Sequence, residues 1–176
     1  MSIKLIATTV IGSGGGPNIE FANIPQTGTD LLILASTRAA AGATVRNMNI
    51  RLNGSTSGYS ERMMDSDGSG ASAASTSAAL INWSTENDSL STANTFSNVS
   101  IYIPNYSGNA VKSLSMESSS ENNATFAVNR ITAAIWSGTS PITSVQLIPE
   151  SGSSFVQNSS ASIYMITKGS NGVTVS

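Results

Sequence analysis

The sequence predicts an all-β protein: one antiparallel β-sandwich, jelly-roll-like, folded as a single domain over residues 1–176. Three observations predict it. Short apolar or alternating runs recur along the chain, clusters of Gly, Asn, Ser and Pro separate them, and no stretch carries a convincing helical stripe. The number of runs is close to the roughly eight main strands of a jelly roll. With 39% hydrophobic and 10% charged residues, the chain is composed like a folded domain with a buried core.

The first strand is predicted in the apolar run 5–11, which ends in a glycine loop, Gly14–Gly16. We expect residues 1–17 to form an N-terminal strand and Gly-rich loop that serves as an attachment arm. The run 19–24 is a second short strand. The run 30–37 is apolar at nearly every position, which predicts a strand covered on both faces.

Alternation of apolar and polar residues predicts the strands that follow. They are the runs 47–54, 97–105, 111–117, 124–136, 142–149 and 161–168. The longest, 124–136, places Phe126 and Val128 on one face but Ile131 and Ile135 on the other, so we expect a bulge or a change of sheet there. The Ala-rich segment 70–83 is the single helix candidate, although its Ser, Thr and flanking Gly fit a strand and loop at least as well.

Charge and composition exclude several classes of function. The net charge is −2, and the eight basic residues are scattered, whereas nucleic acids and anionic membranes require clustered Lys and Arg. The chain has no Cys and no His, which excludes disulfides, thiol nucleophiles, Cys/His zinc sites and His-dependent triads. The N-terminal run resembles neither a signal peptide nor a transmembrane helix.

The stretch "DSDGSG" is the first chemical signal. Asp65, Asp67 and Ser69 match the start of an EF-hand loop, but Thr76 stands where a bidentate Glu is required, and flanking helices are lacking. The stretch therefore predicts a glycine turn beside a strand, with a weak cation site near Asp65 and Asp67 left open.

Carboxylates are the second signal, because a glycosidase needs two of them facing each other. Glu86 with Asp88, or Glu117 with Glu121, are the candidate pairs, but "STENDSLS" has the composition of a solvated loop. We therefore expect no enzyme activity, no catalytic residue, no metal and no cofactor. The Asn-x-Ser/Thr sequons are attributed to chance in a chain rich in Asn and Ser; they begin at Asn53, Asn82, Asn87, Asn98, Asn105, Asn123 and Asn158.

Aromatic residues supply the candidate interaction surface. A stacking platform for a sugar is one interpretation of Tyr59, Trp83, Tyr102, Tyr106 and Trp136, and packing or a subunit interface is the favoured one. Trp136 ends an apolar strand and is assigned to the core. Tyr102 faces away from the apolar side of its strand. The predicted interaction surface consists of Tyr102, Tyr106 and Tyr59.

Five segments, in order, resemble a widespread family of small virion proteins of tailed phages. They are "IEFANIPQTGTDLLILASTR" (19–38), "IRLNGSTSGYS" (50–60), "IYIPNYSG" (101–108), "ITAAIWSGTSPITSVQLIP" (131–149) and "GSSFVQNSSASIYMITKG" (152–169). The resemblance implies a β-sandwich, alone or attached to longer appendage proteins, with structural roles in head decoration, fibres or tails and without established catalytic residues. Met165 stands where the family pattern has Gly, and Gly28 where it often has Tyr.

We therefore expect a structural component of a bacteriophage virion: an accessory, or cement, protein bound to the outside of the capsid. Its partners would be the major capsid protein and itself, as a homotrimer. The alternative is a receptor- or carbohydrate-binding domain of a head or tail fibre. That domain would contact a host-surface glycan through Tyr102, Tyr106 and the loops 53–60 and 151–160. A polysaccharide-degrading enzyme is a third hypothesis and requires one of the carboxylate pairs.

Overall fold

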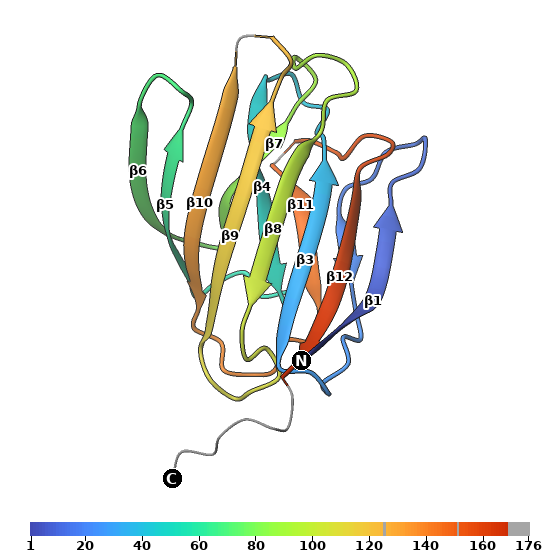
Figure 1. Ribbon diagram of the computed structural model, residues 1–176, viewed down its shortest axis with the longest axis vertical. Helices are drawn as coiled ribbons and strands as arrows, with labels where there is room; N and C mark the ends of the chain where they lie inside the picture. The colour runs from blue at the N-terminus through green and yellow to red at the C-terminus, as the bar shows by residue number, and fades with distance from the viewer. Residues whose placement is uncertain (125, 151, 169–176) are drawn as a thin grey trace.

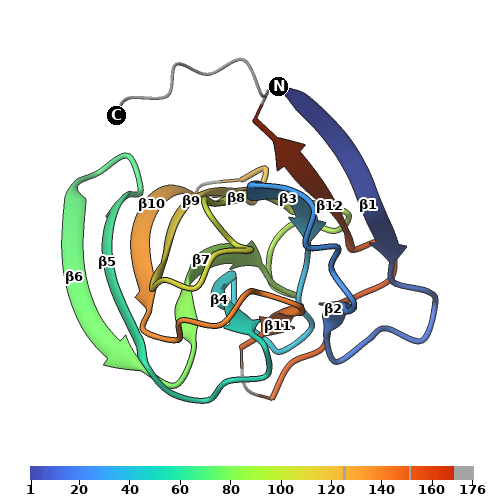
Figure 2. The ribbon, with the colours of Figure 1, turned by 90° about the horizontal axis from the view of Figure 1, so that it is seen from below.

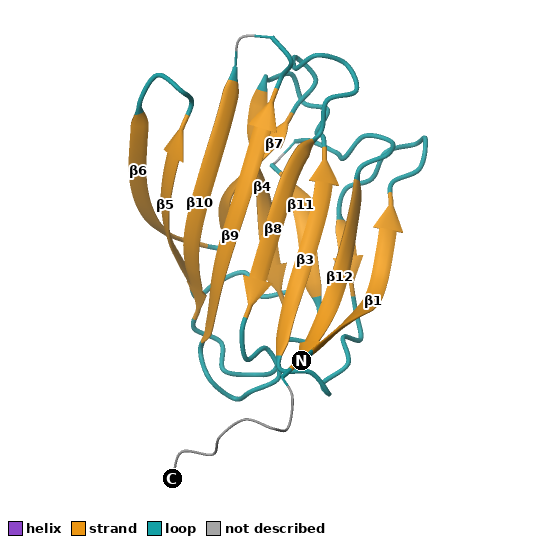
Figure 3. Cartoon of the chain, viewed as in Figure 1, coloured by secondary structure: helices purple, strands orange, loops and turns teal. Residues whose placement is uncertain are grey.

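The protein is an antiparallel β-sandwich. The computed structural model describes residues 1–124, 126–150 and 152–168, and within these ranges twelve strands and no helix are found (Figure 3). The strands form two antiparallel sheets that pack face to face, so the predicted fold class is confirmed. Ser151 and Gly169, which belong to segments named above, lie outside the described residues.

The large sheet has eight strands and faces the viewer in Figure 1. Across the sheet their order is β1 (Ser2–Val10), β12 (Ser160–Thr167), β3 (Asp30–Thr37), β8 (Ser97–Ile103), β9 (Lys112–Glu121), β10 (Ala127–Trp136), β5 (Tyr59–Ser66) and β6 (Ala71–Ala78).

The small sheet has four strands and lies behind the large one. Their order is β2 (Ile19–Phe21), β11 (Val145–Pro149), β4 (Val45–Leu52) and β7 (Ile81–Asn87). Seen from below, the large sheet curves around the small one, with β5 and β6 on one flank and β12 and β1 on the other (Figure 2). Most connections cross between the sheets, as in a jelly roll; the hairpins β5–β6, β8–β9 and β9–β10 stay within the large sheet.

The core lies between the sheets and follows the alternation in the sequence. In β8, Val99, Ile101 and Ile103 are fully buried, while Ser100 and Tyr102 face outward. Met48, Ile50 and Leu52 of β4 meet them from the small sheet. Full burial of each such side chain contributes about 1.5–3 kcal/mol, so these strands hold the sandwich together.

Strand β10 is continuous, although the sequence predicts a bulge or a change of sheet within it. Its register is continuous, with Ala127–Trp136 pairing Glu121–Lys112 of β9, so the expected bulge or change of sheet is absent from this strand. Trp136 is buried as predicted, whereas Ile131 and Ile135 lie on the outer face and are exposed. Apolar residues therefore lie on both faces of an unbroken strand: one set packs in the core, and the other is exposed on the outer face of the sheet.

The helix candidate 70–83 contains strand β6 and the first three residues of β7. The stretch "DSDGSG" forms the turn between β5 and β6, as predicted, with Gly68 at a φ of 86°. Asp67 closes this turn by accepting hydrogen bonds from Ser69 N at 2.9 Å and Gly70 N at 3.3 Å. The composition was ambiguous here because the alanines favour a helix, whereas the Ser and Thr residues between them and the flanking glycines do not.

The N-terminal segment is paired with the large sheet. β1 pairs with β12 from Ser2 opposite Thr167 to Val10 opposite Ser160. Beyond β1, Ile11 N donates to Ser159 O at 2.8 Å and Gly16 N to Phe155 O at 3.0 Å. The prediction of a strand and a glycine loop is confirmed, but both are held by backbone hydrogen bonds.

The abundance of Asn has a backbone explanation. Every non-glycine residue described with a positive φ is an Asn, the residue type that tolerates the left-handed region best after Gly. These are Asn23, Asn53, Asn94, Asn105, Asn123 and Asn158. Four of them begin sequons, so turn geometry accounts for these sequons without glycosylation.

Candidate functional site

Two of the three predicted interaction tyrosines are buried, which corrects the prediction. Tyr59 is 2% exposed and Tyr106 is fully buried. The Tyr59 hydroxyl accepts a hydrogen bond from Leu52 N at 2.9 Å, and its ring stacks on Trp136 with centroids 6.3 Å apart. The Tyr106 hydroxyl donates to Pro25 O. Both rings pack in the core because their hydroxyls find backbone partners there. The side chain of Trp83 lies outside what the structure describes.

Tyr102 does face outward, as predicted, and its hydroxyl is held in place. It donates to Asp30 Oδ2 at 2.8 Å. Asp30 also accepts from Asn105 N at 3.1 Å, and its Oδ1 lies 3.3 Å from Lys168 Nζ. Burial alone would raise the pKa of Asp30, but these partners together lower it, so the carboxylate stays ionised. The hydrogen bond to Asp30 and burial raise the pKa of Tyr102.

Strand register extends Tyr102 into a row across the outer face. Tyr102 lies opposite Leu32 of β3, Leu32 opposite Tyr164 of β12, and Tyr164 opposite Leu5 of β1. Directly opposite residues share a face of a sheet. We call Leu5, Tyr164, Leu32 and Tyr102 the tyrosine row. Leu5 is 50% exposed, and the other three are half-buried.

The tyrosine row also corrects the prediction that the strand 30–37 is covered on both faces. Leu31, Ile33 and Ala35 point into the core, but Leu34 is 42% exposed beside the row. Within the described chain, no layer covers this outer face of β3. An apolar surface of this kind on the outside of a sheet marks an interaction site.

A polar cleft lies on the opposite side of the molecule, where the β5–β6 hairpin approaches the start of β4. Its volume is about 530 Å³. The hairpin supplies Asp65 to Ser72, β4 supplies Val45 to Asn47, β10 and the residue before it supply Phe126, Val128 and Arg130, and Glu150 follows β11. Four separate parts of the chain thus line one open cleft.

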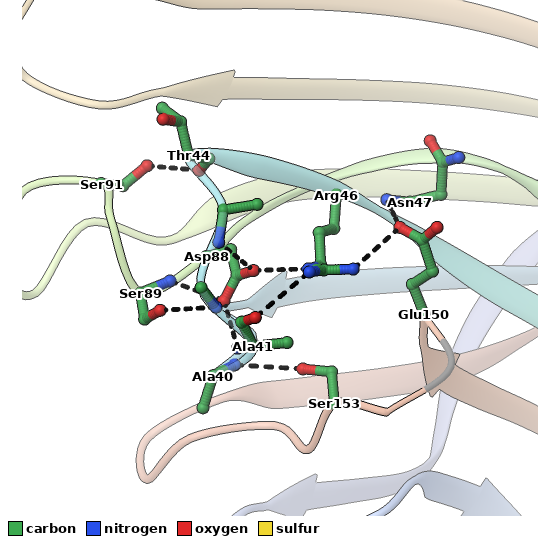
Figure 4. A network of polar contacts seen from close by, with 12 residues as sticks. Ala40, Ala41, Thr44, Arg46, Asn47, Asp88, Ser89, Ser91, Glu150 and Ser153 are labelled. Atoms are coloured by element: carbon green, nitrogen blue, oxygen red, sulfur yellow. Dashed lines mark hydrogen bonds and ion pairs between the residues drawn. The ribbon is translucent and has the colours of Figure 1, made fainter.

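Arg46 is the centre of the charged network on the β4 side of this cleft (Figure 4). Its Nε donates to Asp88 Oδ2 at 2.6 Å, and its Nη1 lies 3.8 Å from Glu150 Oε2. Asp88 also accepts from Ala41 N at 2.6 Å and Ala43 N at 2.9 Å. Burial would raise the pKa of Asp88, but these amides and Arg46 lower it.

Arg130 closes the other side of the cleft. Its Nη1 donates to Asn47 Oδ1 at 2.7 Å and its Nη2 to Asp65 Oδ2 at 2.8 Å. Asp65 also accepts from Ser72 Oγ, and this bond, together with Arg130, lowers the pKa of Asp65. Asp65 is therefore engaged in an ion pair with Arg130, and Asp67 in the hydrogen bonds of the turn. Among the described residues no cluster of three or more potential metal-ligating side chains occurs.

The stretch "STENDSLS" is not the solvated loop that its composition suggests. Glu86 and Asp88 are both fully buried, Glu86 in β7 and Asp88 directly after it. Neither carboxylate oxygen of Glu86 has a hydrogen-bond partner of good geometry. Burial raises the pKa of Glu86 to about 8, and an interaction with the Thr37 side chain opposes only part of this shift. Glu117 and Glu121 are exposed on β9.

Sequence reasoning missed Tyr164, Leu32 and Leu5 as parts of the outer surface, and Arg46 and Arg130 as parts of a cleft. Alternation in "ASIYMITK" was the available signal for Tyr164, because Ile163 is buried and its neighbour must face outward. No helix among the described residues is long and apolar enough to cross a membrane. No family profile, no curated protein and no solved structure matches the chain.

Proposed function

We propose that this chain is a structural protein of a bacteriophage virion that binds the outside of the capsid and stabilises the assembled shell. The observation that carries the proposal is the uncovered outer face of β3. A strand that is apolar at nearly every position is typically buried on both faces. The described chain covers only the inner face of β3 and leaves Leu32 half-buried and Leu34 42% exposed on its outer face. A neighbouring subunit supplies the missing layer.

The chemistry of the tyrosine row suits a protein interface. Tyr is enriched at the centres of interfaces, because it offers a large apolar ring with one polar end. Tyr102 is already oriented through Asp30, so little side-chain entropy is lost on binding. The partners are the major capsid protein and further copies of this chain, as a homotrimer. A protein that binds the assembled shell and not its free subunits stabilises the shell by mass action.

The two departures from the phage family pattern lie in direct contact, which supports the resemblance. A Cβ atom on Gly28 would lie 2.1 Å from Met165 Cγ and 2.7 Å from Met165 Sδ. A large residue at position 28 therefore requires a small one at position 165, which is the combination of the family pattern. This chain has the reverse combination, so the two departures are one compensated exchange.

The alternative, a receptor- or glycan-binding domain at the tip of a fibre, has lost Tyr106, one of its two contact tyrosines, to the core. Copy number separates the two functions. The test is to purify particles of the phage that encodes the chain, count its copies per particle and locate them by electron cryo-microscopy. We expect hundreds of copies spread over the head. A few copies at the tail or at one vertex would favour the fibre function, and absence from the particle would overturn the proposal.

Variants on the outer face make the same test specific. Leu34→Ser, beside the tyrosine row, is expected to weaken binding of added protein to stripped particles by roughly tenfold or more. Ile131→Ser is the matched control, because Ile131 is equally apolar and 64% exposed on the outer face, away from the row. Equal losses for both variants would show that the row is not the contact surface.

A further inference from the structure

The polar cleft offers a second surface that the proposed assembly role does not use. It lies between the tip of the β5–β6 hairpin and the start of β4, whereas the tyrosine row crosses β1, β12, β3 and β8 (Figure 1). Its volume of about 530 Å³ is in the range, roughly 300–1,000 Å³, of pockets that hold small molecules. The hairpin forms one wall of the cavity through Asp65, Asp67 and Ser69 to Ser72, and Figure 2 shows it on the flank where the large sheet curves around the small one.

The polar groups of the cleft are fixed before any ligand arrives. Arg130 is clamped between Asn47 Oδ1 and Asp65 Oδ2, and its side chain is 13% exposed. Arg46 is clamped between Asp88 and Glu150. A site whose side chains are already ordered loses little entropy on binding.

These groups retain unused hydrogen-bonding capacity of both kinds. A guanidinium has five N–H groups; Nη1 and Nη2 of Arg130 each make one of the hydrogen bonds described above, and its buried Nε has no hydrogen-bond partner among the described residues. The carboxylate of Glu150 accepts from Asn47 N at 3.2 Å, but its side chain is 41% exposed, so solvent or a ligand reaches its remaining lone pairs. Donors and acceptors side by side match hydroxyl groups, since each hydroxyl both donates and accepts.

The charge and the apolar part of the lining define the ligand further. Two arginines, Arg46 and Arg130, face three carboxylates, Asp65, Asp67 and Glu150, which leaves one excess negative charge and disfavours phosphate and other anions. Phe126 and Val128 form an apolar side of the cavity. A pyranose ring presents both features: hydroxyls at its edge and an apolar C–H face that packs on an aromatic ring.

We propose that this cleft binds a neutral saccharide, with Glu150, Arg46 and Arg130 hydrogen-bonded to ring hydroxyls and Phe126 against an apolar sugar face. The site differs from the tyrosine surface considered for glycan contact, with which it shares no residue. It is independent of the capsid role, since a decoration protein with or without a sugar site would occupy the same place on the head.

The experiment is a titration of the full chain, labelled with ¹⁵N, with a panel of neutral sugars followed by NMR. The probes are the methyl glycosides of glucose, galactose and mannose, and the disaccharides lactose and maltose. We expect at least one to shift the amide signals of Asn47 and of the hairpin residues Ser69 to Ser72, with a dissociation constant in the millimolar range that is usual for weak ligands. Shifts confined to Tyr102 and Tyr164 would overturn the proposal.

Two variants and one control complete the test. Glu150→Gln and Phe126→Ala are expected to weaken sugar binding by roughly tenfold each, with thermal unfolding unchanged. Glu117→Gln, an exposed carboxylate on the outer face, is the control and retains full binding. Failure of every sugar in the panel to shift the cleft amides would overturn the proposal, as would stronger shifts of the same amides by inorganic phosphate or calcium ions.

Discussion

Strands β8 and β7 face each other across the sandwich and are buried by different means. β8, in the middle of the large sheet, alternates: Val99, Ile101 and Ile103 are fully buried while Ser100 and Tyr102 face outward. β7, at the edge of the small sheet, buries every residue from Ser84 to Asn87, and all four are polar. One strand is held by apolar contact, and the other has to satisfy its polar groups inside the protein.

The edge of β7 is covered by side chains of the large sheet. Thr85 N donates to Ser118 Oγ at 3.0 Å and Asn87 N to Ser97 Oγ at 3.0 Å, while Asn82 N lies 3.1 Å from Glu61 Oε2. Thr85 and Asn87 are alternate residues of β7, and Asn82 lies on the other side of the irregularity in the pairing of β7 with β4. An uncovered edge strand can pair with another chain, so the curvature of the large sheet protects β7 and accounts for its polar sequence.

The largest effect is expected at Glu86, which makes β7 sensitive to pH where β8 is not. The ordinary pKa of Glu is 4.5, and burial raises that of Glu86 to about 8. The folded protein thus keeps a proton that the unfolded chain loses. The resulting stability is complete below pH 4.5 and is lost as the pH rises through 8. The free energy of unfolding should fall by about 1.4 kcal/mol per pH unit, or about 4 kcal/mol between pH 5 and pH 8.

Denaturant unfolding at several pH values measures this dependence. Glu86→Gln should remove the slope, because the amide is neutral at every pH, and should be more stable than the wild type at pH 8. Glu117→Gln, an exposed carboxylate on β9, should retain the wild-type slope. The lowered pKa values of Asp30, Asp65 and Asp88 affect stability only at pH values near and below 3.8, outside this window. A wild-type profile that is flat from pH 5 to pH 8 would contradict the account of Glu86.

A smaller effect on stability is expected at the contact between Gly28 and Met165, which depends on side-chain volume and not on hydrogen bonds. Gly28→Tyr alone should destabilise the protein by about 1–3 kcal/mol, because its Cβ would overlap Met165. Met165→Gly alone should also destabilise it, since it removes a packed side chain from β12. In the double variant each change accommodates the other, and we expect a favourable coupling of about 1–3 kcal/mol. Chemical denaturation of all four proteins closes the cycle, and additive losses would contradict the compensated exchange.

Strands of the β8 kind were predictable from the sequence, because one apolar face leaves a period of two that needs no knowledge of the partner strand. Strand β7 was not predictable in this way, because a polar run has the composition of a loop. It can be recognised as a buried strand only when its hydrogen-bond partners are known. Those partners, Ser97, Ser118 and Glu61, come from three other strands. Local pattern carries no information about them.

In the candidate sites, too, features set by a single strand were predictable from the sequence, and features set by contacts between distant segments were not. The outward direction of Tyr102 follows from alternation within its own strand. The tyrosine row depends on the register of β12 with both β1 and β3, which pair residues from the two ends of the chain. Arg130 meets Asp65 through the pairing of β10 with β5, whereas Arg46 of the small sheet comes close to the hairpin because the large sheet curves around the small one. Sequence alone predicts which way a side chain points, but not what it meets.

The smallest effect is expected at a single edge contact of β7. Ser118→Ala removes the acceptor of Thr85 N and leaves a buried amide unsatisfied, which costs about 1–2 kcal/mol. Ser119→Ala is the matched control: it is the next residue of β9, points to the outer face, and should change stability by less than about 0.5 kcal/mol. Amide hydrogen exchange adds a local measurement, because Thr85 N should lose protection in Ser118→Ala while Asn87 N, held by Ser97, keeps it. Equal stability of the two variants would mean that water replaces Ser118 at the edge, and that curvature of the large sheet alone protects β7.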